Sequence, residues 1–233
     1  EKFAKAAVQL VHLNLTGCQI GGQGLRLILK ALVDGESTEN LLRLDLQNNN
    51  ISLASDSFSY IGHFTNLRAL DVSRNCFTLD TSAQAKIFRA GLAPLTSLQI
   101  LSVAHNKIMD KGCKFVCDIV REHYPALRIL DFAGCFLSKG CLPVFEELLE
   151  HVKSEEPEVD PSRRPSLDEE EYSYIPELVI ELESTTNPEL REILLQENVF
   201  TASQLNDYCG EHPNSVMTQS KCKLNINTSK YIG

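Results

Sequence analysis

The strongest constraint on how this chain can fold is an apolar pattern that returns five times in phase. Each copy has an apolar residue at offsets 0, 3 and 5, Asn or Cys at offset 8, and another apolar residue at offset 10. The copies begin at Leu10, Leu41, Leu67, Leu98 and Leu127. This rhythm matches neither the 3.6-residue period of a helix nor the two-residue period of a strand. It predicts an array of stacked units, each of which buries its apolar face against its neighbours.

The positions within one copy predict its local structure. Offsets 3 and 5 lie on the same side of an extended chain, so a short strand would direct both side chains inward and the residue between them outward. Offset 8 then lies where the chain turns away from the strand. We predict parallel strands near residues 12–16, 43–47, 69–73, 100–104 and 128–133.

The LxxLxLxx(N/C)xL pattern resembles the leucine-rich repeat family over residues 8 to about 150. The resemblance implies an α/β solenoid, or horseshoe, with a parallel sheet on the concave side and helices on the convex side. Repeat spacings near 29 residues and apolar helical faces resemble the ribonuclease-inhibitor-like subclass. In this family the residue at offset 8 bonds to the backbone of adjacent coils, so we expect Cys18 and Cys135 to be buried there. The second copy, of only 26 residues, is expected to carry a shorter or irregular helix.

The sequence divides into four parts. They are residues 1–152 with repeats 1 to 5 and a short N-terminal cap, 153–174 as an acidic flexible loop, 175–210 as a degenerate sixth repeat with a helical cap, and 211–233 as a polar tail. Because the sequence begins with Glu1 rather than Met, we expect it to be part of a longer protein.

The third part is predicted in more detail. Ile175, Leu178 and Ile180 repeat the offsets 0, 3 and 5 and predict a sixth strand. Residues 187–198 are predicted to form a helix that begins with an Asn-Pro signal. Residues 201–209 are predicted to form a last helix, because a Thr and a Gln three residues apart make a capping box.

The acidic loop has one candidate modification site. Residues 155–171 contain eight acidic residues and three prolines, too little apolar surface to offset the entropy of ordering. Ser166 follows two arginines and precedes acidic residues, which is typical of kinase sites. A phosphate there would add negative charge beside the arginines. The alternative is a solvated spacer.

Composition excludes several classes of protein. The net charge of −9 argues against nucleic-acid binding, and no apolar run approaches the roughly 20 residues that span a membrane. The eight cysteines contain no CxxC pair and no zinc spacing, so we expect no metal and reduced thiols. We therefore predict a cytoplasmic or nuclear protein, although sequons at Asn14, Asn50 and Asn227 would favour secretion.

The search for chemistry favours a protein that is not an enzyme. The sequence lacks GxSxG, GxxxxGK[ST], HExxH and a strand followed by GxGxxG, and we expect no catalytic residue and no cofactor. We predict a non-enzymatic protein–protein interaction module within a larger intracellular protein. The alternatives are a GTPase-activating regulator resembling the Ran-activating proteins and a fragment of a ubiquitin-ligase substrate receptor.

The candidate binding residues lie on and beside the predicted concave face. They are Arg43, Asp45, Asn48, Arg68, Asp71, Arg74, Ile100, His105, Ile129 and Asp131. The aspartates would form a column that accepts hydrogen bonds from a protein or peptide partner, possibly a basic one, with the two isoleucines as an exposed apolar floor. The competing interpretation is that these are ordinary solvated residues balanced by neighbouring arginines.

Overall fold

The computed structural model describes residues 10–35, 38–54, 56–154, 192–199 and 201–213. Within those ranges one parallel sheet has six strands in chain order. They are β1 (His12–Asn14), β2 (Arg43–Asp45), β3 (Ala69–Asp71), β4 (Ile100–Ser102), β5 (Ile129–Asp131) and β6 (Glu192–Leu194). The first five confirm the predicted positions, although each is only three residues long.

The register of the sheet follows the sequence pattern. The central residues Leu13, Leu44 and Leu70 are partners across the first three strands, and Leu101, Leu130 and Ile193 continue the row. All six side chains are buried. Because equal offsets pair with each other, a residue type at one offset forms a row that runs across the whole sheet.

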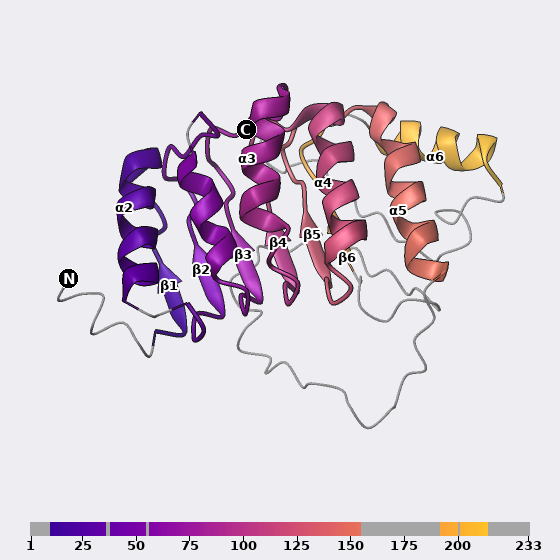
Figure 1. Cartoon of the computed structure of the whole chain (residues 1–233). Helices are drawn as coiled ribbons and strands as arrows, with labels where there is room; N and C mark the ends of the chain where they lie inside the picture. The colour runs from indigo at the N-terminus through magenta and orange to yellow at the C-terminus, as the bar shows by residue number, and fades with distance from the viewer. Residues whose placement is uncertain (1–9, 36–37, 55, 155–191, 200, 214–233) are drawn as a thin grey trace.

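Helices cover the convex side of the sheet (Figure 1). They are α2 (Gly21–Asp34), η2 (Asp56–His63), α3 (Ser82–Leu92), α4 (Met109–His123), η3 (Lys139–Cys141), α5 (Leu142–Ser154) and α6 (Ala202–Glu211). Strands and helices alternate along the solenoid, which confirms the predicted α/β architecture. The last helix begins with the predicted capping box, in which Thr201 and Gln204 bond each other's backbone N–H groups.

The short second repeat carries a 3-10 helix in place of an α-helix, as predicted. Its Phe58 is fully buried, with its ring 5.1 Å from that of Phe77 and stacked at 5.4 Å on that of Phe88. Gly91 of α3 makes this packing possible, since a Cβ at that position would lie 2.7 Å from the Phe58 carbonyl oxygen. Aromatic packing thus fills the space that a full helix would occupy.

A ladder of side chains at offset 8 joins the coils. The Asn75 amide donates to the carbonyls of Leu46 (2.9 Å) and Val72 (2.9 Å), and its oxygen accepts from the N–H groups of Asn49 (3.1 Å) and Ile51 (3.0 Å). Similar bonds are made by Asn49, Asn106 and Asn198. The ladder satisfies backbone groups at the corner where strand hydrogen bonding ends.

The two cysteines of the ladder differ from each other. Cys135 is buried and its thiol donates to the Val103 carbonyl at 3.3 Å, as predicted. The prediction for Cys18 is wrong, because its side chain is exposed. Each ladder residue is covered by the coil that precedes it, and the described residues hold no coil before β1.

The prediction for the sixth repeat needs a correction. The structure forms β6 from residues 192–194, inside the segment predicted to be a helix. The strand predicted at residues 175–180 lies outside the described residues, and β6 is the strand paired with β5. In the sequence, Leu190, Ile193, Leu195, Asn198 and Phe200 match the repeat pattern at every offset.

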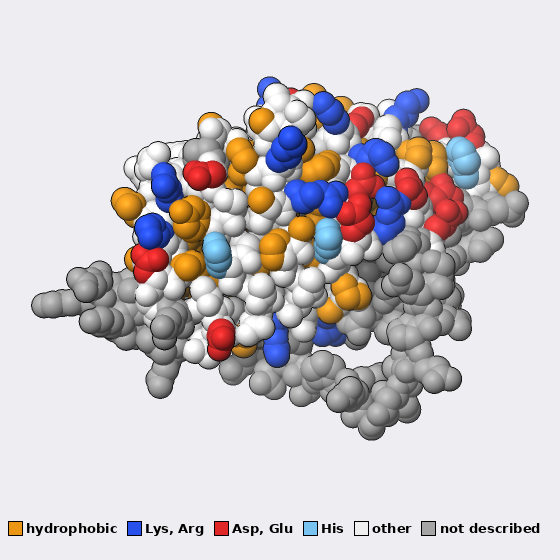
Figure 2. All heavy atoms as spheres, viewed as in Figure 1, with side chains coloured by type: hydrophobic (Ala, Val, Ile, Leu, Met, Phe, Trp, Pro, Cys, Tyr) orange, Lys and Arg blue, Asp and Glu red, His pale blue; other side chains and the backbone are white. Residues whose placement is uncertain are grey.

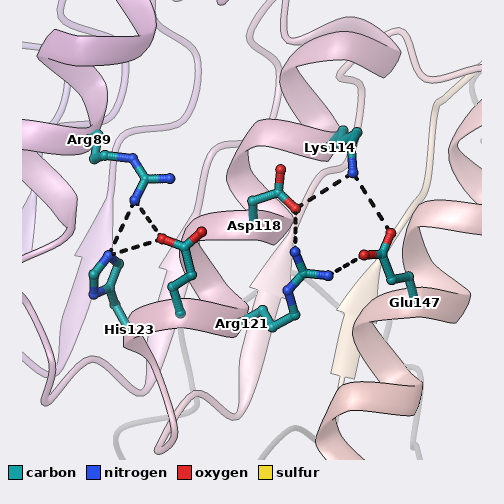
Figure 3. A network of polar contacts seen from close by, with 7 residues as sticks. Arg89, Lys114, Asp118, Arg121, His123 and Glu147 are labelled. Atoms are coloured by element: carbon teal, nitrogen blue, oxygen red, sulfur yellow. Dashed lines mark hydrogen bonds and ion pairs between the residues drawn. The ribbon is translucent and has the colours of Figure 1, made fainter.

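Ion pairs connect the outer surfaces of α3, α4 and α5 (Figure 3). The Arg89 guanidinium of α3 lies 2.6 Å from the Glu122 carboxylate of α4. Arg121 of α4 pairs with Asp118 of its own helix at 3.0 Å and with Glu147 of α5. Such exposed pairs each contribute at most about 1 kcal/mol, so the buried rows hold the coils together and the ion pairs only supplement them.

Candidate interaction surface

The concave face consists of the outward residues at the two ends of each strand. Those of β1 to β5 are His12, Asn14, Arg43, Asp45, Ala69, Asp71, Ile100, Ser102, Ile129 and Asp131. The parallel register places Asp45, Asp71, Ser102 and Asp131 in one row, with adjacent strands about 4.8 Å apart. Three carboxylates therefore share a rigid surface.

Asp45 is neutralised within the protein. Its carboxylate is buried, lies 3.1 Å from the Arg43 Nε atom, and is 2.7 Å from the Nε2 atom of His12. Arg68 was also expected to balance the aspartates, but its side chain is exposed one residue before β3. Asp45 thus uses its acceptor capacity internally, and this part of the row fits the interpretation of balanced charges.

Asp71 and Asp131 are held by their own strand ends. One carboxylate oxygen of Asp71 accepts from the Ser73 N–H at 2.8 Å, and one of Asp131 accepts from the Ala133 N–H at 2.9 Å. The other oxygen of Asp131 accepts from the Ser102 hydroxyl at 2.8 Å. These bonds fix both carboxylates, and the bond to Ser102 joins Asp131 to the neighbouring strand of the row.

The environment of these two carboxylates opposes their charge. Burial raises the pKa of Asp131 to about 6, against the opposing effect of its hydrogen bonds, and the nearby Asp71 carboxylate adds to the rise. Burial also raises the pKa of Asp71, and Asp45 contributes in the same direction. A positively charged neighbour would stabilise the ionised form of both carboxylates.

The apolar part of the face is less open than predicted. Ile100 is half-buried, but Ile129 is only 3% exposed, so the expectation that Ile129 is an exposed contact residue is wrong. The physical reason is that β6 pairs with β5, where Glu192 is the register partner of Ile129. Leu194 of β6 is likewise only 3% exposed.

A second row follows the strands at offset 7, and we call it the edge row. It consists of Gly17, Asn48, Arg74, His105, Gly134 and Glu197, all with positive φ. It therefore contains three of the predicted site residues, which lie beside the sheet and not on it. The left-handed backbone turns the chain from the strand into the ladder.

Side chains of the edge row reach across the coils. The Arg74 guanidinium lies 3.3 Å from the His105 Nε2 atom, and the His105 Nδ1 atom lies 3.8 Å from the Glu197 carboxylate. Gly134 belongs to the coil between those of His105 and Glu197, and a Cβ at Gly134 would lie 2.5 Å from His105 Nδ1. Burial and the Arg74 charge lower the pKa of His105, while Glu197 opposes this shift.

The sequence thus predicted residues that fall into two groups in the structure, and it missed one residue, Glu197. Asp45, Asp71 and Asp131 share the concave row, and Arg74 and His105 share the edge row. Glu197 was missed because its segment was predicted to be a helix, although the pattern starting at Leu190 would have placed it at offset 7. The candidate phosphorylation site Ser166 lies outside the described residues.

Two further observations concern the part of the chain that the structure describes. No three His, Cys, Asp or Glu side chains gather there in a way that could hold a metal ion. No helix in that part has the length and apolar character needed to cross a bilayer.

Three known proteins are similar to parts of this chain. A stretch of 134 residues is 27% identical to human (Homo sapiens) NACHT, LRR and PYD domains-containing protein 14; it covers 57% of this chain and 12% of that protein. The tropomodulin C-terminal domain of Caenorhabditis elegans is 16% identical with a TM-score of 0.47, covering 64% of this chain and 91% of that one. A leucine-rich repeat protein of Leptospira interrogans is 16% identical with a TM-score of 0.25, covering 64% of this chain and 55% of that one.

The family comparison agrees with the repeat pattern. The sequence model described as "Leucine Rich repeat" matches residues 10–29 and 95–117, which contain the starts of the first and fourth copies. The match therefore agrees with the leucine-rich repeat pattern over these two segments of the chain.

Proposed function

We propose that this chain is a non-enzymatic interaction module that binds a basic protein or peptide segment on its concave face. The contact would centre on coils 3 to 5, where Asp71 and Asp131 accept hydrogen bonds and Ile100 supplies apolar surface. The observation that carries the proposal is the pair of fixed carboxylates whose pKa values burial raises. A protein gains no stability from such groups, whereas a cationic partner would relieve their cost.

Geometry supports this location over the rest of the concave row. Asp45 already has two cationic or potentially cationic neighbours, Arg43 and His12. Asp71 and Asp131 are joined instead to backbone N–H groups and a hydroxyl. The Arg43 charge lowers the pKa of Asp71, but burial outweighs this effect. A lysine or arginine of the partner would neutralise these carboxylates. Because the sheet is rigid, binding would cost little conformational entropy at the site.

The proposal includes a subclass and a compartment. The α-helices of five of the six described coils, together with repeat spacings near 29 residues, support the ribonuclease-inhibitor-like subclass. Cys113, Cys117, Cys135 and Cys141 are buried free thiols, which supports a reducing compartment such as the cytoplasm or nucleus.

The experiment compares partner capture by the native chain and by charge-removing variants. Asp71→Asn keeps an oxygen for the Ser73 N–H but removes the charge, so we expect partners to be lost or weakened 5- to 150-fold, about 1–3 kcal/mol. The matched control is Asp34→Asn, which removes an exposed carboxylate of α2 that pairs only with Lys30 among the contacts described.

The readout is quantitative mass spectrometry of proteins captured from cell extract, followed by titration of each captured partner. Equal capture by the native chain and Asp71→Asn would contradict the proposal. Acceleration of GTP hydrolysis by the chain, tested on a panel of GTPases, would contradict its non-enzymatic part.

A further inference from the structure

Three large apolar side chains are exposed on successive coils at one edge of the solenoid. Met109 of coil 4 is 42% exposed, Phe136 of coil 5 is 59% exposed, and Val199 of coil 6 is 63% exposed. Single exposed apolar residues are ordinary, but a contiguous group on a soluble fold marks a contact surface. We call these three residues the lateral patch.

Backbone hydrogen bonds hold the lateral patch together. The Met109 N–H donates to the carbonyl of Cys135 at 3.0 Å, and the Val199 N–H donates to the carbonyl of Leu137 at 2.8 Å. Cys135 and Leu137 are the two chain neighbours of Phe136. Phe136 is therefore flanked by Met109 on one side and Val199 on the other.

The backbone at this patch is strained. Phe136 and Met109 have φ values of +61° and +57°, in the left-handed region that bulky side chains rarely adopt. Coils 1 and 2 place Gln19 and Asn50 in the left-handed region at the position of Phe136, and Asn tolerates that region well. The backbone strain at Phe136 lowers stability, and its exposed side chain gains no burial that would offset this strain. This combination indicates a role in binding and not in folding.

The charges around the patch indicate its occupant. Lys107, at the position equivalent to Phe136 in coil 4, and Lys139, three residues after Phe136, are both exposed. Neither has an ion-pair partner among the described residues. In Figure 2, hydrophobic and basic side chains and one acidic side chain lie near the lower border of the coloured surface.

The nearby acid does not neutralise this rim. Asp110, next to Met109 in the chain, accepts from the Ser138 N–H at 2.7 Å and from the Cys141 thiol at 3.0 Å. Its carboxylate is thus turned toward the start of η3. The patch has an apolar centre with a positive rim, the reverse of the acidic concave face.

We infer that the lateral patch is a second docking site, which binds an acidic peptide segment of a partner protein that carries a bulky apolar residue. The apolar residue contacts Phe136 between Met109 and Val199, and flanking Asp or Glu residues of the segment pair with Lys107 and Lys139. The inference rests on the patch itself and holds independently of what binds the concave face.

The test uses a fluorescent twelve-residue peptide with a central Phe between Asp and Glu residues, titrated by fluorescence anisotropy. Two further peptides serve as probes, one with Ala in place of the central Phe and one with Lys in place of the acids. We expect the acidic Phe peptide to bind the native chain at least tenfold more tightly than either of the others, and its affinity to fall with salt.

Phe136→Asn is the decisive variant, because Asn suits the left-handed backbone and should fold with an equal or higher melting temperature. It should lower peptide affinity at least tenfold, and Lys107→Glu should lower it with loss of the salt dependence. The control Leu27→Gln changes an equally exposed apolar residue of α2 and should have no effect.

Three results would overturn the inference. They are no binding of the acidic Phe peptide, equal binding by Phe136→Asn, and a preference of the patch for anionic lipid vesicles or for a second copy of the chain. Vesicle sedimentation of the native chain and Phe136→Asn tests for lipid binding. Analytical ultracentrifugation of the same two proteins tests for binding of a second copy of the chain.

Discussion

The carboxyl group of Asp131 lies between two strands, where water cannot fully solvate its charge. Its hydrogen bonds to Ser102 and the Ala133 backbone favour the ionised form, yet burial outweighs them and raises the pKa to about 6 from the ordinary value of 3.8. The folded state therefore binds this proton more tightly than the unfolded state does. Between about pH 4 and pH 6 the contribution of Asp131 to the free energy of unfolding therefore falls as pH rises.

Asp131→Asn should remove this penalty. The amide keeps an acceptor for the Ala133 N–H and carries no charge, so we expect the variant to be more stable than the native chain by about 1–3 kcal/mol at pH 7. The two proteins should have nearly equal stability at about pH 2.5, where the carboxyl is protonated in both the folded and the unfolded state. Urea unfolding at several pH values measures this difference.

Ser102→Ala provides the matched control for that measurement. Loss of the hydroxyl removes a bond that favours the ionised carboxylate, so the pKa of Asp131 should rise further and the fall in stability should extend to higher pH. A native chain whose stability does not fall between pH 4 and 6 relative to Asp131→Asn would contradict this account of the carboxylate.

Gly134 is a residue whose backbone conformation and whose neighbours both favour glycine. Its φ is +62°, and an added Cβ would meet the His105 ring at 2.5 Å. Gly134→Ala should cost about 1–3 kcal/mol of stability. His105→Ala in the same chain should restore only the part due to the clash.

Gly210→Ala is the comparison for Gly134→Ala in thermal unfolding. Gly210 lies in α6 with open space around its Cβ position, so Ala should leave stability unchanged or raise it by about 0.5–1 kcal/mol. Equal effects of the two substitutions would show that the edge row does not constrain residue 134.

At the scale of the element, β6 shows how local preference and repeat pattern compete. The surrounding sequence ELREILLQEN is rich in helix formers and follows an Asn-Pro helix start, so local propensity favours a helix. Stacking against β5 buries Ile193 and Leu195 and lets Asn198 complete the ladder, which outweighs that propensity. The pattern was missed because it begins 63 residues after Leu127, far from the usual repeat length.

The coil of β6 should depend on Asn198. Its amide bonds the Phe132 carbonyl at 2.9 Å and its oxygen accepts from the Leu137 N–H at 3.0 Å, so Asn198→Ala leaves both groups without a partner. We expect a loss of about 2–4 kcal/mol, or local opening of β6 and α6. Hydrogen exchange of residues 192–211 distinguishes the two outcomes.

Asn206→Ala supplies the control on the exposed surface of α6, where the same substitution should leave exchange unchanged. Unaltered exchange of β6 in Asn198→Ala would contradict the ladder as the source of its attachment.

At the scale of the whole molecule, the sequence predicted what depends on each coil alone. The pattern placed the first five strands, the short second helix and the row of aspartates, because each follows from offsets within a copy. Burial of Cys18 and exposure of Ile129 were predicted wrongly, because each depends on which coil lies alongside. Which coil packs beside another is a tertiary property, and the sequence pattern of a single repeat does not predict it.

The cysteines report on the whole fold. Cys18 and Cys76 are exposed and should react within minutes with a thiol reagent, while the buried Cys113, Cys117 and Cys135 should react only on unfolding. Burial also raises the pKa of Cys135 to about 12, which slows its reaction. The denatured, unreduced chain should yield all eight thiols, and four disulfides would contradict the proposed reducing compartment.

The central claim is that a cationic group of the partner binds beside Asp71 and Asp131. Calorimetric titration of a captured partner at pH 6, in two buffers of different ionisation enthalpy, measures the protons released on binding. A cation lowers both raised pKa values, so we predict net proton release near pH 6 that declines toward zero at pH 8 and is reduced in Asp131→Asn. Binding with no proton release, or with equal release by Asp131→Asn, would contradict the claim.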